Sequence, residues 1–132
     1  FSHSYMIDFK SKEGFIEELR KTSQLVSAIT GKQMNLFRPP YGVTTPNLAA
    51  ASKDLNYDLI GWNIRSLDTT GDSVKTITER VFKKIRPGAV ILFHDTSEKT
   101  LEVLKQTLNF VKDNGFIVVS TEELLKVRAY KE

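Results

Sequence analysis

Cysteine is absent from the 132 residues of this chain, so a disulfide framework and a zinc site built on thiolates are both excluded. Long apolar runs are also absent. The longest one, at residues 89–93, is the length of a strand and far shorter than a membrane-spanning helix. The chain opens on Phe1 rather than on Met, and we therefore expect the natural N-terminus to lie elsewhere.

A strong charge imbalance is missing as well. Lys and Arg together number 19 against 16 Asp and Glu, for a net charge of +3, and the cations are interleaved with acidic residues. No basic stripe alternates with aromatic residues, so a nucleic-acid partner is not expected. With 40% hydrophobic and 27% charged residues, the composition is that of one soluble globular domain.

Strand-like and helix-like segments alternate along the chain. Helical spacing and capping residues predict helices at 12–30, from Thr45 to about Leu55, from Ser73 to Ile85, at 100–114 and after Ser120. Short apolar segments predict four strands, at 35–37, 57–64, 89–93 and 116–119. This alternation indicates an α/β fold with parallel strands, which could be an open sheet or part of a barrel.

Polar side chains follow three of these strands. Arg38 follows the first strand, residues 65–68 follow the second, and His94 follows the third. Because active sites of such folds lie at the carboxyl ends of the strands, these residues are expected to share one edge. His94 could transfer protons there, or it could be a core histidine bonded to a backbone carbonyl; its position favours neither.

Residues 38–42 combine two prolines with a glycine, which fixes an arginine and presents backbone N–H groups. An ordinary proline-rich turn would look the same. His3, considered alone, is more typical of a surface or core histidine than of a metal ligand.

Three segments together resemble a known family. Phe-Arg-Pro-Pro-Tyr-Gly at 37–42, Ile-Leu-Phe-His-Asp at 91–95 and Phe-Ser-His-Ser-Tyr at 1–5 are similar to motifs of the polysaccharide deacetylase (NodB-homology, carbohydrate esterase family 4) domain. That domain is a distorted (β/α)7 barrel. The resemblance implies that residues 1–132 cover its later strands and lack its N-terminal strands and its first motif.

The resemblance also implies a divalent metal, with zinc expected, for which His3 would supply one ligand. The other ligands in this family are an Asp of the first motif and a histidine four residues before His3, and neither lies in this chain. We therefore expect the 132-residue chain alone to be inactive. It could pair with the missing N-terminal segment or with another copy of itself.

Further roles follow from the same resemblance. His94 would be the general acid that protonates the leaving amine, and Arg38 would orient the catalytic Asp. The backbone N–H of Tyr41 would stabilise the oxyanion, while Leu92 and Pro40 would contact the substrate. The family often has Asp-Ser-x-Asp-Trp where this chain has residues 65–69, so Arg65 and Thr69 replace the Asp that pairs with the acid histidine and the Trp that lines the groove. Either the partner of His94 comes from elsewhere, or the acid works less well near neutral pH.

The function expected from this resemblance is metal-dependent removal of acetyl groups from a polysaccharide, foremost the N-acetylglucosamine units of peptidoglycan or of a chitin-like polymer. O-deacetylation of xylan or another acetylated glycan would use the same residues. A non-catalytic carbohydrate-binding module on a decayed deacetylase fold is the alternative from a different class. The family resemblance places such a protein in the cell envelope or outside the cell.

Overall fold

The computed structural model describes residues 1–131 and divides the chain into two compact units. The first unit holds residues 1–61 together with the C-terminal residues from Thr121, and the second holds residues 62–120. Each unit is described by itself. No helix in the described part of the chain is both long enough and apolar enough to cross a membrane.

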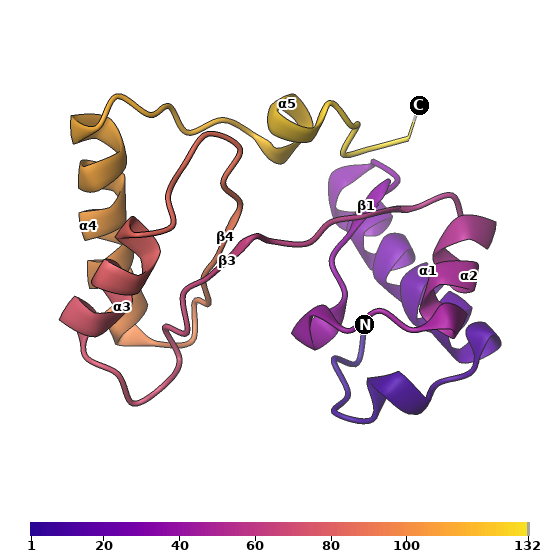
Figure 1. The fold of residues 1–132 in the computed structure, drawn as a ribbon. Coiled ribbons are helices and arrows are strands. Elements are labelled where there is room, and N and C mark those ends of the chain that lie inside the picture. Colours follow the sequence, from indigo (N-terminus) through magenta and orange to yellow (C-terminus); the bar gives the residue numbers. More distant parts are fainter. Residues whose placement is uncertain (132) are drawn as a thin grey trace. The chain divides into compact units, whose positions relative to one another are not determined.

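The first unit is built mainly from two helices, which begin and end where the sequence predicts. Its elements are η1 (Ile7–Phe9), α1 (Lys12–Thr30), β1 (Leu36–Phe37), η2 (Pro40–Gly42), α2 (Pro46–Asp54), β2 (Asp58–Leu59) and α5 (Thr121–Leu125) (Figure 1). The side chain of Thr45 accepts a hydrogen bond from the backbone N–H of Leu48, and Pro46 occupies the first turn of α2. Helix α1 ends at Gly31, whose φ of 70° is the left-handed conformation that glycine adopts most readily.

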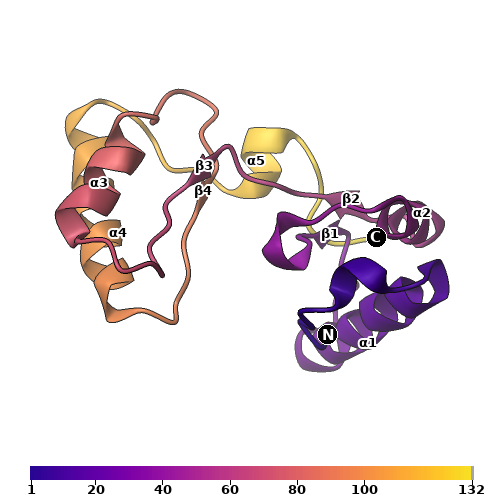
Figure 2. The same cartoon turned by 60° about the horizontal axis from the view of Figure 1, so that its bottom comes forward.

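The core of the first unit lies between α1 and α2, which pack against each other (Figure 2). Its buried members come from α1, α2 and the short η1 helix and comprise Ile7, Phe15, Leu19, Leu48 and Ala51. Phe37 of β1 packs against this cluster. The core therefore holds the end of β1, and with it the start of residues 38–42, against the two helices.

The second unit contains β3 (Ile64–Arg65), α3 (Val74–Phe82), β4 (Ile91–Leu92) and α4 (Glu98–Asp113). Ser73 caps α3 as predicted, because its side chain accepts a hydrogen bond from the backbone N–H of Thr76. Helices α3 and α4 pack side by side (Figures 1 and 2). Ile77, Val81 and Val103 are completely buried in this unit.

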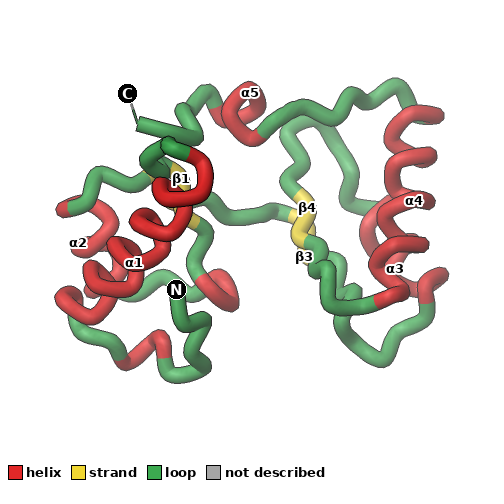
Figure 3. The backbone as a smooth tube through the Cα atoms, turned by 180° about the vertical axis from the view of Figure 1, so that it is seen from behind, coloured by secondary structure: helices red, strands yellow, loops and turns green. Residues whose placement is uncertain are grey.

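The strands form two parallel pairs, β1 with β2 and β3 with β4, drawn in yellow where visible in Figure 3. The predicted α/β class with parallel strands is confirmed, whereas the (β/α)7 barrel stays a prediction. The prediction of a single strand at 57–64 is wrong. Its backbone bonds to Phe37 as far as Ile60 and to Val90 from Asn63 onward, so β2 and β3 belong to different pairs. The change of partner, which is a tertiary property, breaks the strand.

The strand predicted at 116–119 does not form either. This segment is irregular, and the side chains of Ile117 and Val118 are 85% and 68% exposed. A strand needs a neighbour for its backbone N–H and C=O groups, and no described strand pairs with this segment. The predicted association with another copy or with a missing segment stays a prediction.

We expect Ile77→Ala to lower the free energy of unfolding of the second unit by about 2–5 kcal/mol, because the deletion leaves a cavity between packed helices. Urea unfolding followed by the fluorescence of Trp62, the single tryptophan, measures the change. Leu101→Ala on α4 is the matched control, since its side chain is 74% exposed. That change should stay within about 0.5 kcal/mol. An equal loss in both variants would contradict the assignment of the core.

Candidate active site

The carboxylate of Asp68 is the centre of the polar network in the second unit. Asp68 is completely buried. Its Oδ1 accepts a hydrogen bond from Nδ1 of His94 at 2.9 Å and lies 2.7 Å from the hydroxyl of Ser66. Its Oδ2 accepts the backbone N–H of His94 at 2.8 Å and the hydroxyl of Thr100 at 2.6 Å. The carboxylate thus connects the loop after β3, the segment that follows β4 and the first turn of α4.

These hydrogen bonds keep Asp68 ionised. Burial by itself would raise the pKa of the Asp68 carboxyl, because a low-dielectric surrounding disfavours charge. Hydrogen bonds from Thr100, His94 and Ser66 outweigh burial and hold the pKa well below its ordinary value of 3.8. The site therefore contains a fixed negative charge that is screened from water.

The same bonds orient the ring of His94. An ionised carboxylate can only accept hydrogen bonds, so Nδ1 of His94 must carry the proton that faces Asp68. In the neutral ring the other nitrogen, Nε2, is then unprotonated. The His94 side chain is 43% exposed, and Nε2 has no hydrogen-bond partner among the described residues. This arrangement can take up a proton at Nε2 and release it to a bound molecule.

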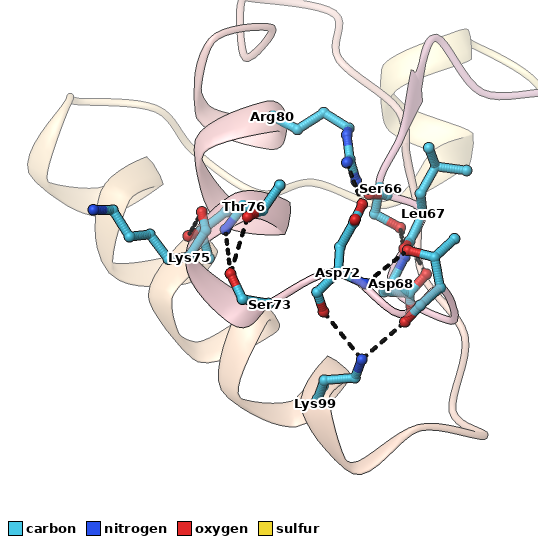
Figure 4. Close-up of polar contacts among 11 residues, drawn as sticks. Ser66, Leu67, Asp68, Asp72, Ser73, Lys75, Thr76, Arg80 and Lys99 are labelled. Atoms are coloured by element: carbon cyan, nitrogen blue, oxygen red, sulfur yellow. Dashed lines mark hydrogen bonds and ion pairs between the residues drawn. The ribbon is translucent and has the colours of Figure 1, made fainter.

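Two cations hold the loop that carries Asp68 (Figure 4). The Arg80 guanidinium donates to the carbonyl of Ser66 at 2.8 Å and forms an ion pair with Asp72. The ammonium of Lys99 donates to the carbonyls of Thr70 and Asp72 at 2.8 and 3.1 Å. One side chain from α3 and one from α4 therefore hold this loop in place by hydrogen bonds.

Leu67, beside Asp68 in this loop, has a φ of 58°. For a residue with a Cβ, that left-handed conformation costs roughly 1–2 kcal/mol. The surrounding hydrogen bonds hold the backbone in this form, which lets Ser66 and Asp68 on either side both point into the buried network. Stored strain of this kind is frequent at functional sites.

In the first unit, the predicted residues lie around Tyr41. Nδ1 of His3 lies 3.2 Å from the Tyr41 hydroxyl, and the two rings meet edge to face with centroids 4.8 Å apart. Tyr41 has a φ of 57° within η2, which Pro40 opens in a half-buried position. Arg38 is exposed directly after β1, and its side chain has no hydrogen-bond or ion-pair partner among the described residues.

The residues around His3 do not form a metal site by themselves. A catalytic zinc commonly has three protein ligands. Nowhere in the described part of the chain do three or more His, Asp or Glu side chains gather in a group suited to a metal ion. The expectation that His3 is a metal ligand therefore stays a prediction, and it requires ligands from outside these residues.

The six predicted site residues are divided between the two units. His3, Arg38, Pro40 and Tyr41 lie in the first unit, and Leu92 and His94 lie in the second. Within the first unit the structure brings His3 and Tyr41 together. Within the second, Leu92 is buried in β4, two residues before His94. A cleft shared by all six residues stays a prediction.

Sequence reasoning missed the partner of His94. It compared Arg65 with the Asp of the family pattern, whereas the carboxylate that contacts His94 is Asp68, three positions later. The expectation of a partner from elsewhere is thus the correct alternative. Asp68 could have been found, since it belongs to the polar cluster after the second predicted strand. The sequence did not indicate that Thr100 bonds to Asp68, because a threonine near the start of a helix resembles an ordinary capping residue.

These features place the chain among α/β proteins with polar side chains clustered at the carboxyl ends of parallel strands. A family model described as "Polysaccharide deacetylase" matches residues 1–60. Together with the relatives below, this match confirms the predicted resemblance. The chain is similar to part of a polysaccharide deacetylase domain of carbohydrate esterase family 4.

Among curated proteins, the chain is 29% identical over 120 residues to the peptidoglycan-N-acetylmuramic acid deacetylase PdaA of Bacillus subtilis, covering 88% of this chain and 46% of PdaA. It is 27% identical over 126 residues to the peptidoglycan-N-acetylglucosamine deacetylase PgdA of Listeria monocytogenes, covering 93% of this chain and 26% of PgdA. The chain thus spans less than half the length of either relative.

Among solved structures, the chain resembles BA3943 of Bacillus anthracis, which is described as a pseudoenzyme of the same esterase family. The TM-score is 0.85 at 27% sequence identity, and the match covers 95% of this chain and 44% of BA3943. This likeness supports the α/β arrangement with parallel strands, since the aligned part includes nearly all of the chain.

We expect Asp68→Asn to lower the free energy of unfolding at pH 7 by about 1.5–3 kcal/mol, because it removes charge-assisted hydrogen bonds. Asp68 has a lowered folded pKa, so its stabilising contribution is complete above its ordinary pKa of 3.8 and is lost as the pH falls toward the folded value. The difference between variant and wild type should shrink below that pH. Urea titrations across pH 2–7 measure it, with Asp113→Asn, an exposed change at the end of α4, as the control. A difference that does not vary with pH would argue against an ionised Asp68.

A second prediction concerns Thr100. Thr100→Val removes the hydroxyl bond to Oδ2 of Asp68 while keeping the side-chain shape, so the carboxylate should hold the His94 ring less firmly. Two-bond ¹H–¹⁵N spectra of the neutral imidazole report which ring nitrogen carries the proton. The wild type and Thr100→Ser should show the Nδ1–H form, and Thr100→Val should show an increased share of the Nε2–H form. Identical spectra for all three proteins would exclude an orienting role for Thr100.

Proposed function

We propose that this chain is the part of a deacetylase domain that carries the general acid. The whole domain would remove N-acetyl groups from peptidoglycan, with N-acetylglucosamine or N-acetylmuramic acid as the reacting sugar. The observation that carries this proposal is the hydrogen bond from Nδ1 of His94 to the buried Asp68 carboxylate. The names of the relatives PdaA and PgdA support the substrate class. In such a reaction, water and the acetamide give acetate and a free amine.

The amine cannot leave the tetrahedral intermediate readily without a proton, and His94 is proposed to supply it. Its Nε2 is the nitrogen that does not face Asp68, and the side chain is 43% exposed, while the proton on Nδ1 stays with Asp68. The carboxylate compensates the positive charge of the ring as long as both nitrogens are protonated. Leu92, two residues earlier on β4, is proposed as the apolar wall beside the acetyl methyl group.

Residues of the first unit have proposed roles of their own. The backbone N–H of Tyr41 is a candidate oxyanion donor, since the positive φ of this residue sets the direction of its peptide groups. The exposed Arg38 would orient an Asp base, and Pro40 would contact the sugar. His3 would be one ligand of a divalent metal, for which zinc is the proposal. As the ligand set is incomplete in these residues, no catalytic step is assigned to the metal.

The same proposal implies that the 132-residue chain is inactive unless the remaining ligands and the catalytic Asp come from another segment. It also implies a location in the cell envelope or outside the cell, where peptidoglycan lies. A non-catalytic carbohydrate-binding role is the second candidate. The incomplete metal ligand set favours it, and BA3943 is a family member described as a pseudoenzyme.

The test is acetate release from peptidoglycan glycan strands by the full-length gene product with added zinc. His94→Ala should lower kcat by about 10²–10⁴-fold, the usual contribution of a general acid. Asp68→Asn should also lower kcat, because the ring loses its orienting partner. Asp113→Asn, which lies outside the network, should leave kcat unchanged.

Circular dichroism of each variant separates loss of catalysis from loss of folding. A folded His94→Ala protein with less than threefold loss of kcat would rule out the role of His94. A folded wild-type protein that binds zinc and glycan but releases no acetate would instead support the non-catalytic candidate.

A further inference from the structure

Arg65 is an exposed cation beside the residues assigned to the acetyl site. It ends β3 and lies in register with Leu92 of β4. Residues in register on parallel strands project from the same face. His94 lies two residues beyond Leu92, past the end of β4. Ile64, which projects from the opposite face, is 1% exposed. Arg65 and Leu92 therefore share the face away from the buried Ile64, and His94 follows Leu92 by two residues.

The acidic side chains that follow Arg65 in the sequence form no ion pair with it in the described part of the chain. Asp68 accepts its hydrogen bonds from His94, Thr100 and Ser66, and Asp72 is paired with Arg80. Asp95 is exposed and makes no ion pair with Arg65. Within the described residues, the Arg65 side chain has no hydrogen-bond or ion-pair partner of its own. Its guanidinium is thus free to bind an anion brought by a ligand.

The chemistry of the substrate identifies that anion. A guanidinium can donate two parallel hydrogen bonds to a carboxylate in a planar, bidentate arrangement. Both reacting sugars carry the acetamide on carbon 2, but muramic acid also carries a lactyl ether with a carboxylate on the adjacent carbon 3. A cation at the end of the strand beside β4, which His94 follows, is well placed to meet a group on carbon 3 when His94 protonates the carbon-2 nitrogen.

We propose that Arg65 binds the lactyl carboxylate of the reacting sugar and makes N-acetylmuramic acid the preferred substrate over uncharged N-acetylglucosamine. This inference rests on the proposed deacetylase function, and it deepens that function by naming the substrate. It also gives a role to the departure from the family pattern at Arg65. The carboxylate next to His94 comes from Asp68, so position 65 is released from pairing with the histidine and can contact substrate.

The experiment compares two substrates on the full-length gene product: peptide-free peptidoglycan glycan strands and N-acetylglucosamine oligomers. Mass spectrometry after digestion identifies which sugar has lost its acetyl group. Arg65→Gln should lower kcat/KM on muramic acid units by about 10–100-fold, the effect of losing a charge-assisted hydrogen bond. The same variant should change kcat/KM on the glucosamine oligomers by less than threefold.

Two control variants separate the local effect from net charge. Arg65→Lys keeps the charge but loses the planar guanidinium. Its kcat/KM on muramic acid units should lie between the values of wild type and Arg65→Gln. Arg86→Gln removes an exposed arginine in the turn after α3 and should match wild type on both substrates. Glycan strands whose lactyl carboxylates have been converted to amides should react equally with wild type and Arg65→Gln.

An equal loss on both substrates, no loss on either, or a wild type that acts on glucosamine alone would overturn the inference and leave the proposed function intact. A wild type inactive on both substrates would overturn the proposed function. In that case, titration of the ¹⁵N-labelled 132-residue chain with muramic acid and glucosamine disaccharides tests Arg65 directly. Weaker binding of the acidic sugar by Arg65→Gln would then support only the contact between Arg65 and the lactyl carboxylate, and unchanged binding would refute that contact.

Discussion

The second unit depends on one buried charge. The Asp68 carboxylate is removed from water, and such a group is tolerated only when its oxygens receive good hydrogen bonds. Those bonds come from the chain on both sides of β4: from Ser66 after β3, from His94 after β4 and from Thr100 in α4. Satisfying this single group therefore fixes the relative positions of two strand ends and a helix.

The same requirement links stability to chemistry. The bonds that lower the pKa of Asp68 also hold Nδ1 of the His94 ring against the carboxylate, while the His94 side chain stays 43% exposed. The residue proposed as the acid thus has its tautomer and direction determined before any substrate binds, which is the preorganisation that proton transfer needs. Arg80 and Lys99 extend this order outward, since their bonds hold the strained loop around Leu67 in place.

The departure at position 65 has a simple physical explanation in this network. An arginine beside an acid histidine would disfavour the protonated ring if it were the nearest charge. Here the nearest charge is the Asp68 carboxylate, at 2.9 Å from Nδ1, and Arg65 lies exposed at the strand end. His94 is therefore paired with the carboxylate of Asp68, even though position 65 carries Arg in place of the Asp of the family pattern.

The sequence by itself determined the helices and the family. Caps such as Thr45, Ser73 and Gly31 act within a few residues, so their effect could be predicted from local pattern, and the motifs around Arg38 and His94 carried the resemblance. Tertiary structure decided which strands form. It split 57–64 between two partners and left 116–119 unpaired, because a strand exists only where another backbone meets it. It also decided that Asp68, rather than position 65, contacts His94, since that choice depends on the turn at Leu67 and on a hydroxyl 32 residues away.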